Sequence, residues 1–190
     1  LDKRNQKFKP TDGYRSFYSF DLPLISENNT LTNTINHRFY SQYFDNNVFS
    51  LSMLLKTANS ISGDDVKLSE RLNVPSSRLR GFESGKVGPK DGNDFIGGNY
   101  VYALNATTSM PQLFQNLQNL DLSFFFDAAN VWGVDYDSSL SDSSKIRSSV
   151  GIAMDLFTPV GPMSFSLAET LTKEDSDITE SFRFSIGTTF

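Results

Sequence analysis

The feature that most constrains this chain is an alternation of apolar and polar residues with a period of two, which recurs almost from one end to the other. The last stretch, TESFRFSIGTTF, shows it most plainly. Read backward from the chain end in steps of two, one face carries Phe190, Thr188, Ile186, Phe184 and Phe182. Because successive side chains of a strand point to opposite faces, the pattern predicts a β-strand that runs to the last residue.

Other segments fit the same template, and together they predict an all-β fold of about ten strands. They span residues 1–9, 14–24, 31–44, 47–59, 66–74, 97–109, 119–130, 145–158, 161–172 and 177–190. The first and the fifth fit least well, and helical spacing is convincing nowhere. Most of the strands are long, and tight turns between them alternate with longer polar loops. This arrangement favours an antiparallel up-and-down meander over a sandwich of short strands.

The composition suits strands that meet a different solvent on each side. The chain has 17 Phe and 7 Tyr but only 1 Trp, and Ser, Thr, Asn and Asp fill most positions between the aromatic residues. No stretch approaches the roughly 20 apolar residues of a membrane helix. A membrane β-strand needs only about 9–11 residues that face lipid and lumen alternately, so the modest apolar content does not exclude a membrane barrel.

An open meander leaves two edges, and each unpaired backbone group at an edge costs several kcal/mol in lipid. We therefore expect the chain to form part of a larger, closed transmembrane β-barrel. Its opening, LDKRNQKF, has no initiator Met and resembles the middle of a strand, so we also expect residues upstream. A soluble β-sandwich, in which two apolar sheet faces meet, is the alternative that the pattern leaves open.

Charge, cysteine and histidine content limit the possible functions. The net charge of -5, with acidic residues gathered in expected loops, argues against nucleic acid as a partner. No cysteine is present, so disulfides and thiolate metal sites are excluded. His37 is the only histidine, and without a nucleophile motif it is expected to be a polar residue of the lumen or of an interface. We predict no catalytic residue, no metal site and no cofactor, and hence no enzyme.

The stretch from 78 to 99, RLRGFESGKVGPKDGNDFIGGN, is the least strand-like part of the chain. Long loops without secondary structure are usually functional or disordered. Arg80, Gly81 and Phe82 favour an ordered loop, because an Arg fork binds carboxylates, Gly allows close backbone approach and Phe fills an apolar gap. Composition alone favours the other interpretation, a solvated surface loop.

Six motifs connect the chain with a known family. They are RLRGF, VGPKDG, GGN, FFFDAANVWG, IRSSVGIAMDLFTPVGPMSFSLA and the terminal FRFSIGTTF. In this order, and with the strand spacings preserved between them, they resemble the C-terminal barrel of BamA-type outer-membrane assembly proteins. The resemblance covers residues 66–190 strongly, whereas residues 1–65 agree in strand pattern only.

This resemblance implies a sixteen-stranded barrel in the outer membrane of a Gram-negative bacterium. The chain, 1–190, is then a single partial barrel domain that supplies about the last ten strands, and the periplasmic repeats of the family are absent from it. A long loop, about 75–96, is implied to turn back into the barrel lumen.

The family also implies a set of contacts that hold this loop. The Arg of its Arg-Gly-Phe motif, here Arg80 before Gly81 and Phe82, pairs with acidic residues on neighbouring strands. Asp127 matches one acidic position, and its predicted lumen-facing phase agrees with that role. Thr107 occupies the other acidic position, which is a departure from the family.

For the terminal strand, the resemblance implies weak pairing with the first strand of the barrel, at a seam that opens sideways toward lipid. The terminal aromatic residue belongs to the signal by which barrels are recognised, and Gly187 lies where the family bends this strand inward. The residues implied in the seam and the signal are Phe182, Phe184, Ile186, Gly187 and Phe190.

The implied function is the folding and insertion of β-barrel proteins into the outer membrane, without covalent chemistry. The implied partners are the C-terminal strands of unfolded outer-membrane proteins, the outer-membrane lipids, and accessory assembly lipoproteins that bind through the periplasmic repeats. The C-terminus is expected on the periplasmic side. Two alternatives stay open: a two-partner secretion translocator of the same superfamily, and a passive porin-like barrel.

Overall fold

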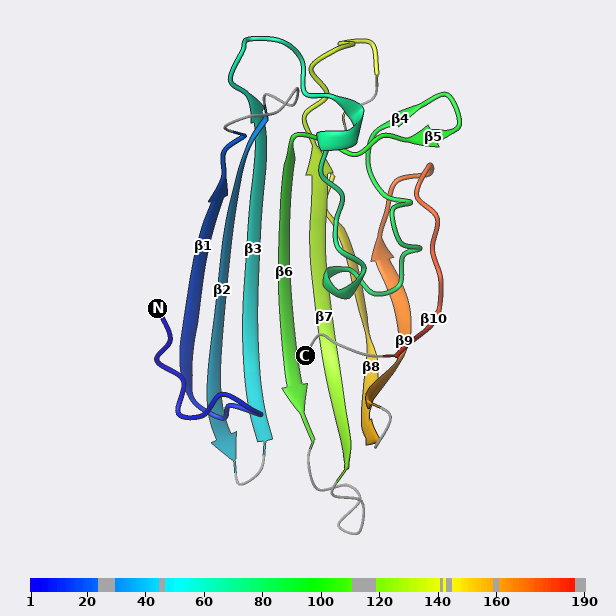
Figure 1. The fold of residues 1–190 in the computed structure, drawn as a ribbon. Coiled ribbons are helices and arrows are strands. Elements are labelled where there is room, and N and C mark those ends of the chain that lie inside the picture. The colour runs from blue at the N-terminus through cyan, green and yellow to red at the C-terminus, as the bar shows by residue number, and fades with distance from the viewer. Residues whose placement is uncertain are drawn as a thin grey trace.

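One curved antiparallel sheet forms most of the molecule (Figure 1). The computed structural model describes residues 1–23, 30–44, 47–110, 119–140, 142, 145–158 and 161–186. The strands of the sheet are β1 (Gly13–Asp21), β2 (Thr30–Phe44), β3 (Asn47–Ser60), β6 (Tyr100–Ser109), β7 (Leu120–Trp132), β8 (Arg147–Thr158), β9 (Gly161–Thr172) and β10 (Phe182–Ile186). Each pairs with its neighbours in chain order, as an up-and-down meander requires.

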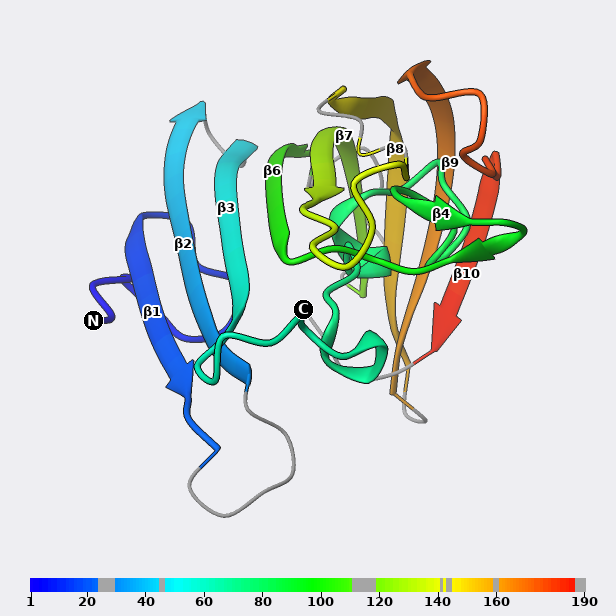
Figure 2. The same cartoon turned by 90° about the horizontal axis from the view of Figure 1, so that it is seen from above.

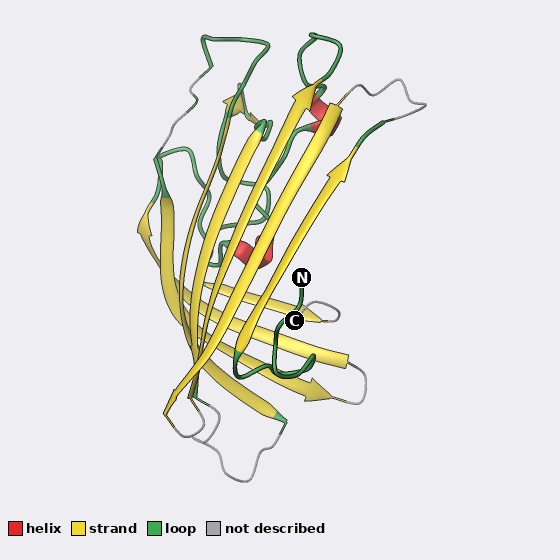
Figure 3. Ribbon diagram, turned by 90° about the vertical axis from the view of Figure 1, so that its left-hand side faces the viewer, coloured by secondary structure: helices red, strands yellow, loops and turns green. Residues whose placement is uncertain are grey.

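The long connection between β3 and β6 contains the remaining regular elements. They are the 3-10 helices η1 (Leu68–Glu70) and η2 (Ser76–Arg78) and the short hairpin β4 (Lys90–Asp91) and β5 (Asp94–Phe95). Seen from above, the strands follow an arc, and this connection lies on the concave side (Figure 2). The strands are long and strongly tilted relative to one another (Figure 3). Within the described residues, no helix has the length and apolar character of a membrane span.

The convex face of the sheet is apolar, as the alternation predicts. Exposed residues on it include Tyr18, Phe20, Ile35, Phe39, Met53, Leu55, Phe124, Phe126, Ile152, Leu167, Phe182, Phe184 and Ile186. The register aligns them across strands, since Ile152 lies opposite Phe124 on one side and Leu167 on the other. A continuous apolar band of this kind is unfavourable in water and suits hydrocarbon.

The concave face carries small and polar residues and supports a second, internal core. From the strands come Leu54, Ala58, Val101, Ala103, Ala129 and Val131, and from the connection come Val66, Leu72, Val74, Leu79, Phe82 and Val87. Ala58, Ala103 and Ala129 have no exposed surface. Their short side chains let the connection approach the sheet closely enough to exclude water, which stabilises the folded loop.

Eight strands of the predicted ten appear in the main sheet, and the two weakest predictions are wrong. Residues 1–9 make only one isolated bridge, between Asp2 and Arg15. Residues 66–74 contain η1 and a single bridge instead of a strand. Val66, Leu72 and Val74 pack on the concave face of the sheet, whereas Leu68 is exposed. A period of two does not reveal which apolar surface a segment covers.

Two further expectations have clear outcomes. His37 lies on the convex face of β2, where its Nδ1 atom is 2.8 Å from the hydroxyl of Ser16, and not in the lumen. The β-sandwich alternative is not supported by the described part of the chain. Its second sheet consists of β4 and β5, which have two residues each and cannot cover the apolar face of the main sheet.

The apolar band gives a direct test of the expected membrane environment. We predict that Ile152→Arg on the convex face of β8 destabilises the protein in lipid by about 2–4 kcal/mol, because the charge enters hydrocarbon. Ser50→Arg places the same side chain on the concave face of β3 and serves as the control, with a much smaller effect. Unfolding by denaturant in vesicles measures both, and equal losses would contradict the assignment of the two faces.

Candidate functional site

A loop that comprises residues 75–96 lies against the concave face of the sheet, where sequence analysis expected a lumen-directed loop (Figures 1 and 2). Its first part contains η2 and continues through Arg80, Gly81 and Phe82. The turn of η2 begins after Pro75, whose fixed backbone angle suits the residue before a helical turn. The loop is therefore ordered, and the interpretation as a solvated surface loop does not hold.

The Arg80 guanidinium binds the carboxylate of Asp127 on β7 with two hydrogen bonds. Nε lies 2.7 Å from Oδ2, and Nη2 lies 2.8 Å from Oδ1. The backbone N–H of Arg80 donates to the same Oδ2 atom at 3.1 Å. The guanidinium also lies over the ring of Phe125, with 3.5 Å between its central carbon and the ring centroid. Charge-assisted, bidentate pairs of this kind are among the strongest hydrogen bonds in proteins.

Asp127 has no exposed side-chain surface, so its charge depends on these partners and on Asn105 of β6. The Asn105 amide donates to Asp127 Oδ1 at 2.8 Å and to the carbonyl of Arg78 at 2.9 Å. Its own oxygen accepts from Arg78 at 3.1 Å. Thr107, which stands where the family has its second acidic residue, lies two residues further along the same face of β6. A neutral amide thus binds the carboxylate and the loop together, and sequence analysis had not assigned that role to Asn105.

Gly81 is required by both its backbone angle and its surroundings. Its φ is +88°, a region that L side chains rarely adopt. An added Cβ atom would lie 3.1 Å from Cβ of Ser149 and 3.2 Å from Cβ of Ala168, which is tighter than ordinary contact. The next residue, Phe82, is almost completely buried in the internal core. The motif therefore combines a charged anchor, a close backbone approach and an apolar anchor.

A second buried ion pair, which sequence analysis missed, joins the start of β8 to the segment before β10. Arg147 Nε lies 2.8 Å from Asp177 Oδ2, and both side chains are almost fully buried. Asp177 also accepts from the backbone N–H of Gly88 at 3.3 Å, so the pair contacts the loop. Asp177 belongs to the acidic stretch KEDSD. Its one buried carboxylate has no local sequence signal, because its partner lies 30 residues away.

A third ion pair, between Arg71 and Asp135, lies at the rim beyond the strand ends. The Asp135 carboxylate accepts from the backbone N–H of Val66 at 2.9 Å and from the Asn99 amide at 2.7 Å. Burial by itself raises the pKa of Asp135, but these hydrogen bonds and the Arg71 charge outweigh burial and lower the pKa below its ordinary value. The carboxylate therefore stays charged and fixes the entry into the loop.

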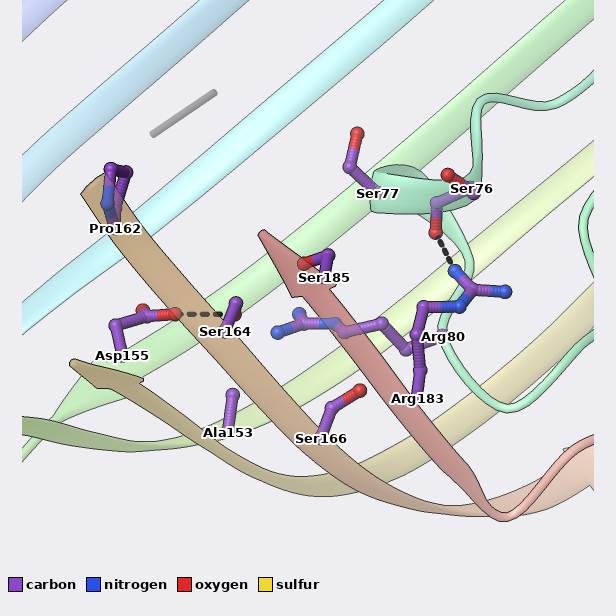
Figure 4. Close-up of a pocket in the computed structure, with 10 residues that line it drawn as sticks. All are labelled: Ser76, Ser77, Arg80, Ala153, Asp155, Pro162, Ser164, Ser166, Arg183 and Ser185. Atoms are coloured by element: carbon purple, nitrogen blue, oxygen red, sulfur yellow. Dashed lines mark hydrogen bonds between the residues drawn. The ribbon is translucent and has the colours of Figure 1, made fainter. Parts of the chain in front are cut away.

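A polar pocket of about 250 Å³ lies between the loop and the last strands (Figure 4). Among the residues that line it are Ser76 and Arg80 from the loop, Asp155 from β8, Ser164 from β9 and Arg183 from β10. Hydroxyl groups dominate the lining, which suits water and polar polypeptide groups. Across the described ranges, no three His, Asp or Glu side chains come together in a way that could hold a metal ion.

At the end of the sheet, β10 pairs with β9 and has its other edge open within the described residues. Phe182, Phe184 and Ile186 all point to the convex face and are exposed. The Phe184 ring lies 4.8 Å from the ring of Phe165, centroid to centroid. Gly187 and Phe190 lie outside the described residues, so their implied roles remain predictions.

A curved up-and-down sheet with an apolar convex face, whose concave face holds an ion-paired loop, is the wall of a transmembrane β-barrel with an occupied lumen. The model of the Omp85 superfamily domain matches residues 1–190. The chain belongs to the Omp85 superfamily, and its relatives make it a BamA-type member.

Individual relatives belong to the same kind of protein. The chain is 32% identical to outer membrane protein assembly factor BamA of Neisseria meningitidis over 59% of its own length and 17% of that protein. It is 24% identical to the sorting assembly machinery 50 kDa subunit of Saccharomyces cerevisiae, of which it covers 41%. The crystal structure of BamA from Haemophilus ducreyi without POTRA domains 1–3 matches the whole chain with a TM-score of 0.87 and 29% identity, and the chain spans 41% of it.

The Arg147 and Asp177 pair predicts a large loss of stability when one partner is removed. Arg147→Met leaves the Asp177 carboxylate buried without its cation, and such losses are typically about 3–5 kcal/mol. Asp2, whose side chain is 41% exposed in its pair with Arg4, is the control, because Asp2→Ala should change stability little. Denaturant unfolding in detergent micelles compares the variants, and a small effect of Arg147→Met would show that water reaches Asp177.

Proposed function

We propose that this chain is part of the barrel of an outer-membrane assembly machine, which folds β-barrel proteins and inserts them into the outer membrane. The observation that carries the proposal is a BamA-type barrel wall whose concave face binds the loop through the buried Arg80 and Asp127 pair. An open strand edge presents backbone donors and acceptors, to which an incoming strand can add. The work is then done by hydrogen bonding and membrane insertion, with no covalent step.

In this proposal, the loop is held in the lumen by Arg80, Gly81, Phe82 and Asp127. Arg80 and Asp127 supply the charged contact, and Phe82 anchors the loop in the internal core. A loop held in this way fills the lumen and keeps it from acting as an open pore. It also supports the concave face of β7 and β8, next to which the last strands must move.

The seam in the proposal is the open side of the C-terminal strand. Phe182, Phe184 and Ile186 face the hydrocarbon there, and Gly187 supplies a bend that shortens the paired length. Phe190 completes the terminal signal.

The partners of this function are unfolded outer-membrane proteins, which present their own C-terminal strands, and the lipids around the seam. Accessory assembly lipoproteins are expected to act through periplasmic repeats, and the C-terminus is expected in the periplasm. A membrane that is thinner beside a short hydrophobic belt lowers the cost of inserting a new strand. If the chain belonged to a two-partner secretion translocator, we would expect export of one substrate. If it belonged to a passive porin, we would expect a large steady conductance.

The charged contact of the loop gives the test of this proposal. Arg80→Ala and Asp127→Ala, each introduced into the full-length protein, should make the loop cleavable by protease and lower client insertion at least tenfold, because breaking a buried pair costs about 3–5 kcal/mol. Arg15→Met removes an exposed arginine of β1 and is the matched control. Insertion of an unfolded barrel protein into liposomes is the measurement.

Two results would count against the proposal. Unchanged insertion in both variants, with an intact loop, would remove the pair from the mechanism. A large, steady conductance of the unmodified protein, without insertion activity, would favour the porin.

A further inference from the structure

The segment that leads into β10 leaves the sheet and pairs with the lumen loop. The last backbone contact that ties it to β9 runs from Ala168 N–H to the Ser181 carbonyl, at 2.9 Å. Before that point, Glu180 N–H donates to the Gly81 carbonyl at 3.1 Å, and Glu83 N–H donates to the Ile178 carbonyl at 2.9 Å. Residues 81–83 and 178–180 thus form an antiparallel pair inside the concave face.

Arg183, on the concave face of β10, adds side-chain contacts to this pairing. Its guanidinium donates to the backbone carbonyls of Ser76 and Phe82 and to the carboxylate of Glu180 (Figure 4 shows the contact with Ser76). Ser76 and Phe82 lie at the two ends of the turn that carries Arg80. The planar fork of arginine can hold three acceptors in fixed directions, whereas a lysine ammonium acts as a single point charge.

The turn 76–82 is therefore held from two sides. Arg80 binds it to Asp127 on β7, and Arg183 binds it to β10. In the sheet, β7 and β10 are separated by β8 and β9. A displacement of β10 away from β9 must then carry the turn along and strain the Arg80 contact, or else break the hydrogen bonds of Arg183.

We propose that Arg183 is a positioning residue that couples the C-terminal strand to the lumen loop, so that residues 76–86 and 177–183 move as one unit. The coupling itself does not depend on the activity of the protein, whereas its use during insertion rests on the proposed function. Opening of the seam at β10 therefore weakens the contact between Arg80 and Asp127 through this unit. By thermodynamic reciprocity, loss of that contact shifts the equilibrium of the seam toward opening.

Hydrogen–deuterium exchange of the full-length protein in detergent tests the coupling without any activity assay. Arg183→Met should speed exchange about tenfold in peptides from 76–86 and from 177–183 together, because bonds from a charged donor are lost. Arg183→Lys keeps the charge opposite Glu180 but not the planar fork. Its exchange rates should therefore lie between those of the unsubstituted protein and those of Arg183→Met. Arg15→Met on β1 is the control and should change neither segment.

Faster exchange in 177–183 alone, with 76–86 unchanged, would overturn the coupling. So would an equal increase throughout the barrel strands, which would mean that Arg183 only supports global stability. Unchanged exchange in both segments would likewise overturn it.

An engineered disulfide tests whether the unit stays intact during insertion. Glu83 and Ile178 are exposed and lie opposite each other, and directly opposed antiparallel residues have the Cα spacing that a disulfide needs. This chain contains no cysteine of its own, so within it the pair Glu83→Cys with Ile178→Cys forms one defined bond. With this disulfide closed, the Arg183→Met protein should again show slow exchange. In the protein that keeps Arg183, closing the disulfide should leave insertion within about twofold of that of the reduced form.

If insertion is lost when this bond is closed and regained when it is reduced, the loop and the strand must separate during insertion. That result would overturn the proposal that they move as one unit. If the protein without any substitution inserts no client, the proposed function fails, and the exchange experiment still decides whether the loop and the strand are coupled.

Discussion

The structure depends on a carboxylate that has no access to water. Asp127 is fully buried on the concave face of β7, and a charge in that place must be paired or it is strongly unfavourable. Arg80 supplies the pairing charge and Asn105 supplies a further hydrogen bond. Because Arg80 belongs to the loop, satisfying the carboxylate and positioning the loop are the same event. The internal core then follows, since Phe82 enters it two residues later.

The sheet separates two environments, and that separation explains the residue types on each strand. On the convex face, large apolar residues such as Phe124 and Ile152 align across strands. On the concave face, Ala103 and Ala129 are small because the loop must approach closely. A soluble protein would hide its large apolar residues and expose its polar ones. In this sheet the large apolar residues are exposed on the convex face. The polar residues lie on the concave face, because that face binds a polypeptide through ion pairs.

Near the C-terminal strand, the loop takes part in the backbone pairing of the wall. The segment before β10 exchanges its partner, from β9 to residues 81–83, and Arg183 reinforces this exchange. A strand held partly by a loop has fewer contacts with the sheet than a strand inside it. In the proposed function, this division of contacts lets the last strand separate while the remainder of the wall stays intact.

The sequence by itself determined the strands and their two faces, because alternation with a period of two is a local property that each strand carries alone. It also placed Arg80, Gly81, Phe82 and Asp127 together, through a resemblance and a matching phase on β7. It could not separate true strands from residues 66–74, since Val66 and Leu72 alternate in the same way but cover the concave core.

Only the tertiary structure decided the second partner of Asp127 and the partners of Asp177 and Arg183. Asn105 is a further partner because it is the amide on β6 that reaches both the carboxylate and the loop. Asp177 and Arg183 bind groups that are far away in the chain, and no local pattern indicates which of several similar charges will be buried. The curvature of the sheet brings these groups together, and that curvature arises from the pairing of all the strands.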